Sequence, residues 1–351
     1  NAHIMNLIET LIAKLQNHPK RFVFTDGEDA RVLQAARQIV TRQMGVPMLI
    51  GDRSRIKSKA AKLDIITKGI RIIEPERSSE LDQFAQELKA LPRFAELSDE
   101  QARRQVVDPN VYATLMLKRN QANALIAGAT DKASSALRPL FQIIGTQDGV
   151  KTASSLLVID MEAKNVGIDG ALFMGDCGVI PEPDEEQLAD IAVTTASLAY
   201  HITNSRPKVA MLSYSTHGNP RHAPIAKIQA ATRLAREKAA RWGLEADIEG
   251  DIQIDAALDR ATAQLKGIED SPVAGDANVL IFPDLNSGNI ASKLIHILSG
   301  ANKYGQIIMG LKQPAAEISR GSTAHDILGA AAIVGCQAID HRLLFGRKDY
   351  D

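Results

Sequence analysis

The sequence predicts an α/β fold with a parallel sheet, because short runs typical of buried strands alternate with amphipathic helical stretches. The run Ala-Leu-Ile-Ala-Gly at residues 124–128 is typical of such a strand, and the apolar spacing between Val32 and Val40 is typical of such a helix. A length of 351 residues indicates two domains. With 45% hydrophobic and 24% charged residues, the chain should bury a sizeable core.

The alternation continues through both halves of the chain. In the first half the expected strands are 21–25, 46–50, 70–73 and 124–128, and the expected helices are 7–15, 32–40, 79–91, 98–107 and 111–120. In the second half the expected strands are 156–160, 171–174, 209–213, 279–283 and 307–309, and the expected helices are 186–201, 225–242 and a last one ending near residue 338. Turn residues between Gly145 and Gly149 predict a domain boundary, and a second crossing is expected near Gly305.

The charge balance excludes partners that need a strong overall field. The chain has 41 Lys and Arg against 42 Asp and Glu, a net charge of -1, so nothing favours nucleic acid or an anionic membrane. Aromatic residues make up only 4% of the chain, which leaves few side chains on which bases could stack. Anions are therefore expected to bind at local sites.

Cysteine usage and hydropathy indicate a cytoplasmic protein. Cys177 and Cys336 are the only cysteines and lie far apart in the sequence, so neither a disulfide framework nor a zinc site is expected. No apolar run approaches the roughly 20 residues that span a bilayer.

The segment richest in chemically useful residues follows the expected strand 307–309. Ser319, Arg320 and Gly321 come just before the last expected helix, where free backbone N–H groups and the helix dipole favour an anion and a guanidinium suits phosphate. Asp326 lies about one turn into that helix and could serve as a base. Alternatively, Ser322 or Thr323 caps the helix and Asp326 complements its dipole.

Several other chemistries lack their motifs. A Ser-His-Asp hydrolase is disfavoured because the adjacent His325 and Asp326 project about 100 degrees apart on a helix, and because the chain has no Gly-x-Ser-x-Gly elbow. Neither Gly-x-Gly-x-x-Gly nor a P-loop is present, which argues against NAD and against P-loop nucleotide chemistry.

Taken in order, residues 279–289, residues 318–321 and Asp326 resemble the phosphate acetyltransferase (phosphotransacetylase) family. Supporting stretches are 26–33, 137–139, 142–144, 150–155, 211–216, 255–257 and 270–275. The resemblance implies two α/β domains around a cleft, similar to the isocitrate/isopropylmalate dehydrogenase-like fold. The first domain would then comprise 1–149 and 305–351, and an inserted second domain, 150–304, would carry the dimer contact.

The resemblance also implies an activity. Members of the family transfer an acetyl group reversibly between acetyl phosphate and coenzyme A (CoA), by direct thiolate attack, in acetate metabolism. CoA would be a substrate, no other cofactor or active-site metal is implied, and the protein would be a cytoplasmic homodimer.

The same resemblance assigns residues to the site. Ser319, Arg320 and Asp326 match the family's catalytic group, and Arg138 and, more loosely, Arg93 match arginines that bind the phosphates of CoA or the acyl phosphate. Ser154, Asn286 and Asn289 are further expected substrate contacts. The alternatives are that Arg93 and Arg138 are solvated surface arginines and that the asparagines only form a turn and a cap.

Simple acid-base chemistry limits what Asp326 can do by itself. A thiol with a pKa of about 8.5 facing a carboxylate with a pKa of about 3.9 leaves a gap of roughly 4.6 units, or about 6 kcal/mol against proton transfer in water. We therefore hypothesise that Ser319 and Arg320 hold the thiol and stabilise the developing charge, so that proton loss and carbonyl attack occur together.

Two departures from the family pattern leave other functions open. Residues 131–136 read Asp-Lys-Ala-Ser-Ser-Ala where a His-Ser-Thr-Ala-Asp-Thr type run is usual, and His217 stands where lysine is common. A longer acyl phosphate, butyryl or propionyl, is thus an alternative substrate. A catalytically silent acetyl-CoA-sensing domain, like that of bacterial malic enzymes, is the alternative from another class, and a dehydrogenase on the same scaffold is a third.

Overall fold

The computed structural model describes residues 7–161 and 165–339, and these form two compact units. The first unit comprises residues 7–146 together with Leu311–Ile339, and the second comprises the described part of Gln147–Gly310. Residues 305–310 were expected in the first domain but belong to the second unit, where Ile307, Ile308 and Met309 pair with a neighbouring strand. Residues 340–351 lie outside the described residues.

The first unit is built on a sheet in which every pairing is parallel. Its strands, in spatial order, are β3 (Arg71–Ile73), β2 (Gly45–Ile50), β1 (Lys20–Phe24), β4 (Ala124–Ala127) and β11 (Ala315–Glu317). β4 is buried along its whole length, which explains its continuous apolar sequence. The carboxyl ends of β1, β4 and β11 therefore meet at one edge of the sheet, where α/β proteins commonly bind ligands.

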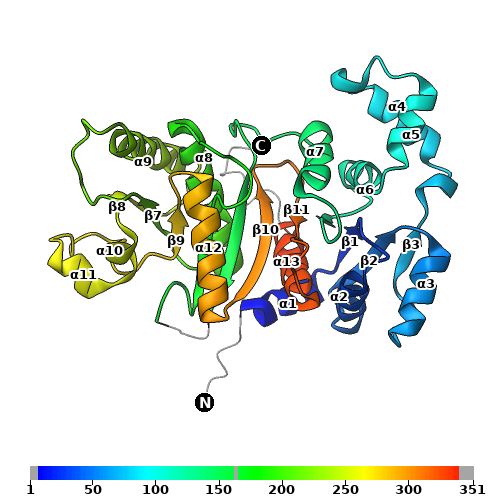
Figure 1. Cartoon of the computed structure of the whole chain (residues 1–351), viewed down its shortest axis with the longest axis horizontal. Coiled ribbons are helices and arrows are strands. Elements are labelled where there is room, and N and C mark those ends of the chain that lie inside the picture. Colours follow the sequence, from blue (N-terminus) through cyan, green and yellow to red (C-terminus); the bar gives the residue numbers. More distant parts are fainter. Residues whose placement is uncertain (1–6, 162–164, 340–351) are drawn as a thin grey trace. The chain divides into compact units, whose positions relative to one another are not determined.

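Helices lie on both sides of this sheet (Figure 1). α13 contacts both α1 and α2 on one side, and α6 and α7 contact each other on the opposite side. The helices of the first unit are α1 (Leu7–Asn17), α2 (Ala30–Thr41), α3 (Arg53–Lys62), η1 (Pro75–Arg77), α4 (Leu81–Lys89), η2 (Pro92–Phe94), α5 (Asp99–Val106), α6 (Pro109–Lys118), α7 (Ala133–Ile143) and α13 (Ala324–Gln337). α13 is buried along nearly its whole length and packs its small residues against β1, β4 and β11.

The second unit has a mixed sheet, not the purely parallel one expected. Its strands, in spatial order, are β10 (Asn302–Met309), β5 (Ser154–Asp160), β6 (Ala171–Gly175), β9 (Val279–Ile281), β7 (Lys208–Leu212) and β8 (Asp247–Ile252). β5 pairs antiparallel with both β10 and β6, whereas β6, β9, β7 and β8 are parallel. The connection 161–170 is shorter than the dozen or more residues that a parallel crossover requires, so β6 runs back along β5.

The helices of the second unit also pack on this sheet (Figure 1). They are α8 (Glu185–Thr203), α9 (Ala223–Arg241), α10 (Ile254–Leu258), α11 (Arg260–Leu265) and α12 (Leu285–Ser299). α12 contacts β5 and β6, and its Ala291 and Ile295 pack against the core. Among the described residues of both units, no helix is long and apolar enough to cross a membrane.

Two strands were not predicted from the sequence. β8 reads Asp-Ile-Glu-Gly-Asp-Ile and is an edge strand, so it is not an apolar run. β11 reads Ala-Ala-Glu, which is short and has little intrinsic strand preference. It forms a strand because it pairs in register with β4, from Ala315 opposite Leu125 to Glu317 opposite Ala127.

Candidate functional site

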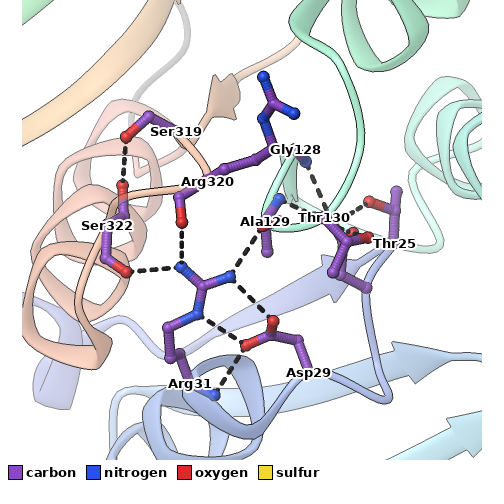
Figure 2. Close-up of polar contacts among 10 residues, drawn as sticks. Thr25, Asp29, Arg31, Gly128, Ala129, Thr130, Ser319, Arg320 and Ser322 are labelled. Atoms are coloured by element: carbon purple, nitrogen blue, oxygen red, sulfur yellow. Dashed lines mark hydrogen bonds and ion pairs between the residues drawn. The ribbon is translucent and has the colours of Figure 1, made fainter.

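Three loops meet at the carboxyl edge of the first unit's sheet (Figure 2). One follows β1 and carries Thr25 and Asp26, one follows β4 and comprises residues 128–130, and the third follows β11 and contains Ser319 and Arg320. Because β1, β4 and β11 are adjacent and parallel, residues nearly 300 positions apart are brought into contact. This edge holds the three residues expected to be catalytic.

Asp26 fixes the loop that follows β4. Its carboxylate accepts backbone N–H groups from Gly128 at 3.1 Å, Ala129 at 3.2 Å and Thr130 at 3.1 Å, and the Thr25 hydroxyl at 2.9 Å. Gly128 has a φ of +98 degrees, and a Cβ there would lie 2.7 Å from the carbonyl oxygen of residue 318. Only glycine therefore lets the loops after β4 and β11 approach so closely.

Arg31, in the first turn of α2, joins all three loops. Its Nη1 donates to the carbonyl oxygens of Arg320 at 2.7 Å and Ser322 at 2.8 Å, and its Nη2 donates to that of Ala129 at 2.8 Å. Nε and Nη2 also donate to the Asp29 carboxylate, at 3.0 and 2.9 Å. Figure 2 shows the guanidinium at the centre of these contacts.

The Asp29–Arg31 pair is charged over the neutral range. Partial burial raises the pKa of Asp29, but hydrogen bonds from Arg31 outweigh burial and hold that pKa below its ordinary value. The same hydrogen bonds raise the pKa of Arg31. Asp29 also caps α2 by accepting the backbone N–H of Arg31 at 2.8 Å.

Ser319 and Asp326 are held within the segment that enters α13. The hydroxyls of Ser319 and Ser322 lie 3.2 Å apart. Thr323 caps the helix and Asp326 completes a capping box, because the Asp326 N–H donates to Thr323 Oγ1 at 3.1 Å and the Thr323 N–H donates to Asp326 Oδ2 at 2.7 Å. Of the two residues expected to cap this helix, Ser322 and Thr323, the structure shows Thr323 as the cap. Asp326 is only 9% exposed, and its Oδ1 accepts no hydrogen bond from the described residues.

Three arginines expected in the site are exposed. The Arg320 side chain points away from Arg31 in Figure 2, although its carbonyl group faces Arg31. Arg138 lies on α7. Gln142 lies on the same helix, and when its amide oxygen is turned toward Arg93, that oxygen accepts hydrogen bonds from Arg93 Nε and Nη2 at 3.2 Å each. Within residues 7–161 and 165–339, no carboxylate lies within ion-pair distance of Arg93, Arg138 or Arg320.

These arginines are therefore available to an anionic ligand. Because Arg138 and Gln142 are four residues apart on one helix face, Gln142 holds Arg93 about one turn from Arg138. α7 itself contacts β11, the strand that leads to Ser319.

The remaining expected contacts lie in the second unit. Ser154 begins β5 and is buried. Asn286 lies in the first turn of α12 and Asn289 at the start of the second, where Asn289 Nδ2 donates to the Cys177 carbonyl oxygen at 3.1 Å. Asp284 caps that helix, so a cap lies where the alternative interpretation expected one, although the capping residue is neither asparagine.

Asp26 and Arg31 had no expected role in the site, although both belong to the stretch 26–33 that supported the resemblance. A signal was present: an aspartate directly after a strand, followed by a helix-capping Asp29 with an arginine two residues later. The sequence does not show which distant carbonyl and N–H groups these side chains contact.

Residues 6–335 match the family described as phosphate acetyl/butaryl transferase. The chain belongs to this family. It is 37% identical over 334 residues to a phosphate acetyltransferase of Acetivibrio thermocellus, with 95% of this chain and 98% of that protein covered. The recognition made from residues 279–289, residues 318–321 and Asp326 is thus confirmed. Membership makes the protein an acyltransferase.

Solved structures agree on the fold. A phosphotransacetylase from Streptococcus pyogenes superimposes with a TM-score of 0.85 at 32% identity, covering 95% of this chain and 98% of that one. A protein described as a 4-hydroxythreonine-4-phosphate dehydrogenase from Salmonella typhimurium superimposes with a TM-score of 0.51 at 11% identity, covering 91% of this chain and 99% of that one. This likeness concerns the fold alone and confirms the dehydrogenase-like α/β class.

Proposed function

We propose that the protein transfers an acetyl group reversibly between acetyl phosphate and CoA. The observation that carries the proposal is the exposed Arg320 guanidinium, free of any described carboxylate, in the same short segment as the buried Asp326. Relatives named phosphate acetyltransferase, 37% and 36% identical over 334 residues, support the choice of substrates.

In the proposed reaction the CoA sulfur attacks the acyl carbon of acetyl phosphate. The sulfur–carbon bond forms, the bond from that carbon to the phosphate oxygen breaks, and inorganic phosphate leaves. Asp326 accepts the thiol proton, while Ser319 and Arg320 hold the thiol and oppose the negative charge that grows on the acyl oxygen and phosphate. No electrons are exchanged, so CoA serves as a substrate and the chemistry asks for no resident cofactor.

The other exposed arginines suit a role in binding. Arg93 and Arg138 present planar guanidinium groups that can form paired hydrogen bonds to the phosphates of CoA or acetyl phosphate. We assign Ser154, Asn286 and Asn289 to further substrate contacts. Asn286 and Asn289 follow β9 at its carboxyl end, where α/β proteins usually bind ligands.

We also propose that two copies associate through α12 in the cytoplasm. Four of its side chains form one exposed apolar stripe: Ile290, Leu294, Ile297 and Leu298, which are 58%, 51%, 73% and 81% exposed. An adjoining face already packs on the core through Ala291 and Ile295, so the apolar surface of the helix extends beyond the part that its own unit covers. Both described cysteines are free thiols, which agrees with a reducing compartment.

Light scattering after size-exclusion chromatography tests the dimer. Ile297→Lys should shift the protein toward the monomer mass, because a charge would be buried in the contact. Leu265→Lys, on α11 and 88% exposed, is the matched control and should leave the mass unchanged. A dimer that survives Ile297→Lys would show that α12 is not the contact.

Thioester formation from CoA and acetyl phosphate, followed by ultraviolet absorbance, tests the activity. We expect rapid formation with acetyl phosphate and slower formation with propionyl and butyryl phosphate. Faster turnover of butyryl phosphate would assign the longer substrate, in keeping with the altered residues 131–136. Absence of thioester at high enzyme concentration, with NAD and malate as controls for a dehydrogenase, would favour a sensing domain.

A further inference from the structure

We propose that Arg31 is a positioning residue that holds Ser319, Arg320 and Asp326 in their reactive arrangement without touching either substrate. The inference rests on the proposed acyl transfer and goes beyond it, because it assigns a role to a side chain outside the reacting group.

Arg31 has no side-chain donor left for a ligand. A guanidinium carries five N–H groups in a rigid fork. The five hydrogen bonds of its side chain go to Arg320 O, Ser322 O, Ala129 O and both oxygens of Asp29. Asp29 also balances its charge at 2.9 Å. Arg31 thus differs from Arg93, Arg138 and Arg320, which face no described carboxylate.

The hydrogen bonds of Arg31 hold each of the three reacting residues, either directly or through one or two neighbouring residues. The bond to the Arg320 carbonyl oxygen fixes that residue's backbone with its side chain turned away from Arg31 (Figure 2). The bond to the Ser322 carbonyl oxygen holds the residue whose hydroxyl lies 3.2 Å from that of Ser319. Ser322 is followed by Thr323, whose N–H binds Asp326.

The arrangement of carbonyl and carboxylate groups around residue 31 requires an arginine. The carbonyl groups come from the loops after β4 and β11, and the carboxylate comes from the start of α2. A lysine ammonium is a point charge with three donors and cannot span these groups with the planar fork. Displacement of reacting groups by about 1 Å can cost about 100-fold in rate.

The test compares Arg31→Lys with Arg37→Lys. Arg37 lies on the same helix, is also half-buried, and also donates to two loop carbonyls, those of Ile66 at 3.0 Å and Lys68 at 3.1 Å. Arg31→Lys should lower kcat about 100-fold. Its KM for CoA and for acetyl phosphate should change less than about threefold, since no substrate contact is lost. Arg37→Lys should keep wild-type kcat.

Two further measurements separate positioning from loss of the fold. In Arg31→Ala, added guanidinium ions should restore part of kcat, which a change in global stability alone would not allow. Amide hydrogen exchange in residues 128–130 and 319–326 should be faster in Arg31→Lys than in Arg37→Lys, while both keep a cooperative thermal transition.

The outcomes are distinguishable. A rise in KM with unchanged kcat in Arg31→Lys, or equal kcat and equal exchange in the two lysine variants, would overturn the assignment. If the wild-type protein makes no thioester, the proposed function fails, and the hydrogen-exchange comparison still decides whether Arg31 holds these loops.

Discussion

Two parts of the first unit carry exposed arginines, but their backbones are held differently. In segment 319–326 the backbone is tied down by Arg31 and by the capping box of Thr323 and Asp326. On α7, by contrast, Arg138 is exposed, and Lys132, the N-cap residue before the helix, makes no side-chain capping hydrogen bond. The backbone of segment 319–326 is therefore preorganised, whereas the start of α7 has no such side-chain contacts from the described residues.

We infer from this difference that segment 319–326 and α7 have different roles in the reaction. Groups that oppose charge in a transition state must be in place before reaction, since reorganisation would add to the barrier. Groups that bind the phosphates of a long, flexible substrate need charge and reach more than exact placement. We therefore expect changes in segment 319–326 to lower kcat and changes at α7 to raise KM.

Asp326→Asn should have the largest effect. The amide oxygen can still accept the Thr323 N–H, so the helix cap survives while the base is lost. Loss of a general base typically costs 10²- to 10⁴-fold, and we expect kcat to fall within roughly that range with little change in KM. Steady-state kinetics measure this, and turnover equal to that of the wild type would exclude Asp326 as the base.

Arg320→Lys should come next. The backbone carbonyl would still bind Arg31, but the planar fork would be lost, and removal of a donor at a developing charge costs about 10²- to 10³-fold in kcat. Initial rates at saturating concentrations of both substrates measure the loss. A change in KM with unchanged kcat would place Arg320 with the substrate-binding arginines and would show that segment 319–326 and α7 do not differ in role.

Arg138→Gln should raise the KM for CoA or acetyl phosphate by at least about 10-fold, since one charge-assisted contact contributes roughly 1.5–3 kcal/mol and about 1.4 kcal/mol corresponds to tenfold. Arg93→Gln should act in the same direction. The matched control is Arg119→Gln, because this arginine of the first unit is already paired with Glu87 at 2.7 Å. A kcat loss as large as that of Arg320→Lys would show that α7 takes part in the chemistry.

Thr323→Ala should have a smaller effect. It removes the cap of α13 and should destabilise the protein by about 1 kcal/mol in urea unfolding. The Asp326 carboxylate remains, so kcat should fall far less than in Asp326→Asn. The two variants together separate the cap from the proposed base.

The smallest expected effect is on the way the stability of the protein depends on pH. The pKa of Asp29 is lower in the folded protein than in the unfolded chain, so the unfolded chain binds the proton more tightly and stability falls with acidification. The contribution is fully present above about pH 4 and is lost as the pH falls through the lowered value. Thermal midpoints between about pH 6 and pH 3 should therefore fall less steeply in Asp29→Asn.

The fold was predictable wherever local pattern and tertiary environment agree. Strands such as β1, β2 and β4 have apolar runs, and α13 begins at Ala324 as the residues before it indicated. The prediction failed where the environment decides. β11 is Ala-Ala-Glu and becomes a strand only by pairing with β4, and β6 is antiparallel to β5 because its connection is short.

The candidate site was predictable in part for the same reason. Ser319, Arg320 and Asp326 lie within one short stretch, so their common position at a helix start follows from local spacing. Their proposed roles stay predictions. The contacts of Arg31 with residues almost 300 positions away could not be derived, since a single sequence does not say which carbonyl a guanidinium will meet.

The sequence by itself determined the α/β class, the family and the segment that carries the reacting groups, because periodicity, composition and motif order are local properties of the chain. Only the tertiary structure decided which arginines are free and which is saturated. Arg31 and Arg320 are the same residue type, each near a helix start. The adjacency of β1, β4 and β11 surrounds the first with carbonyl groups and a carboxylate and leaves the second exposed.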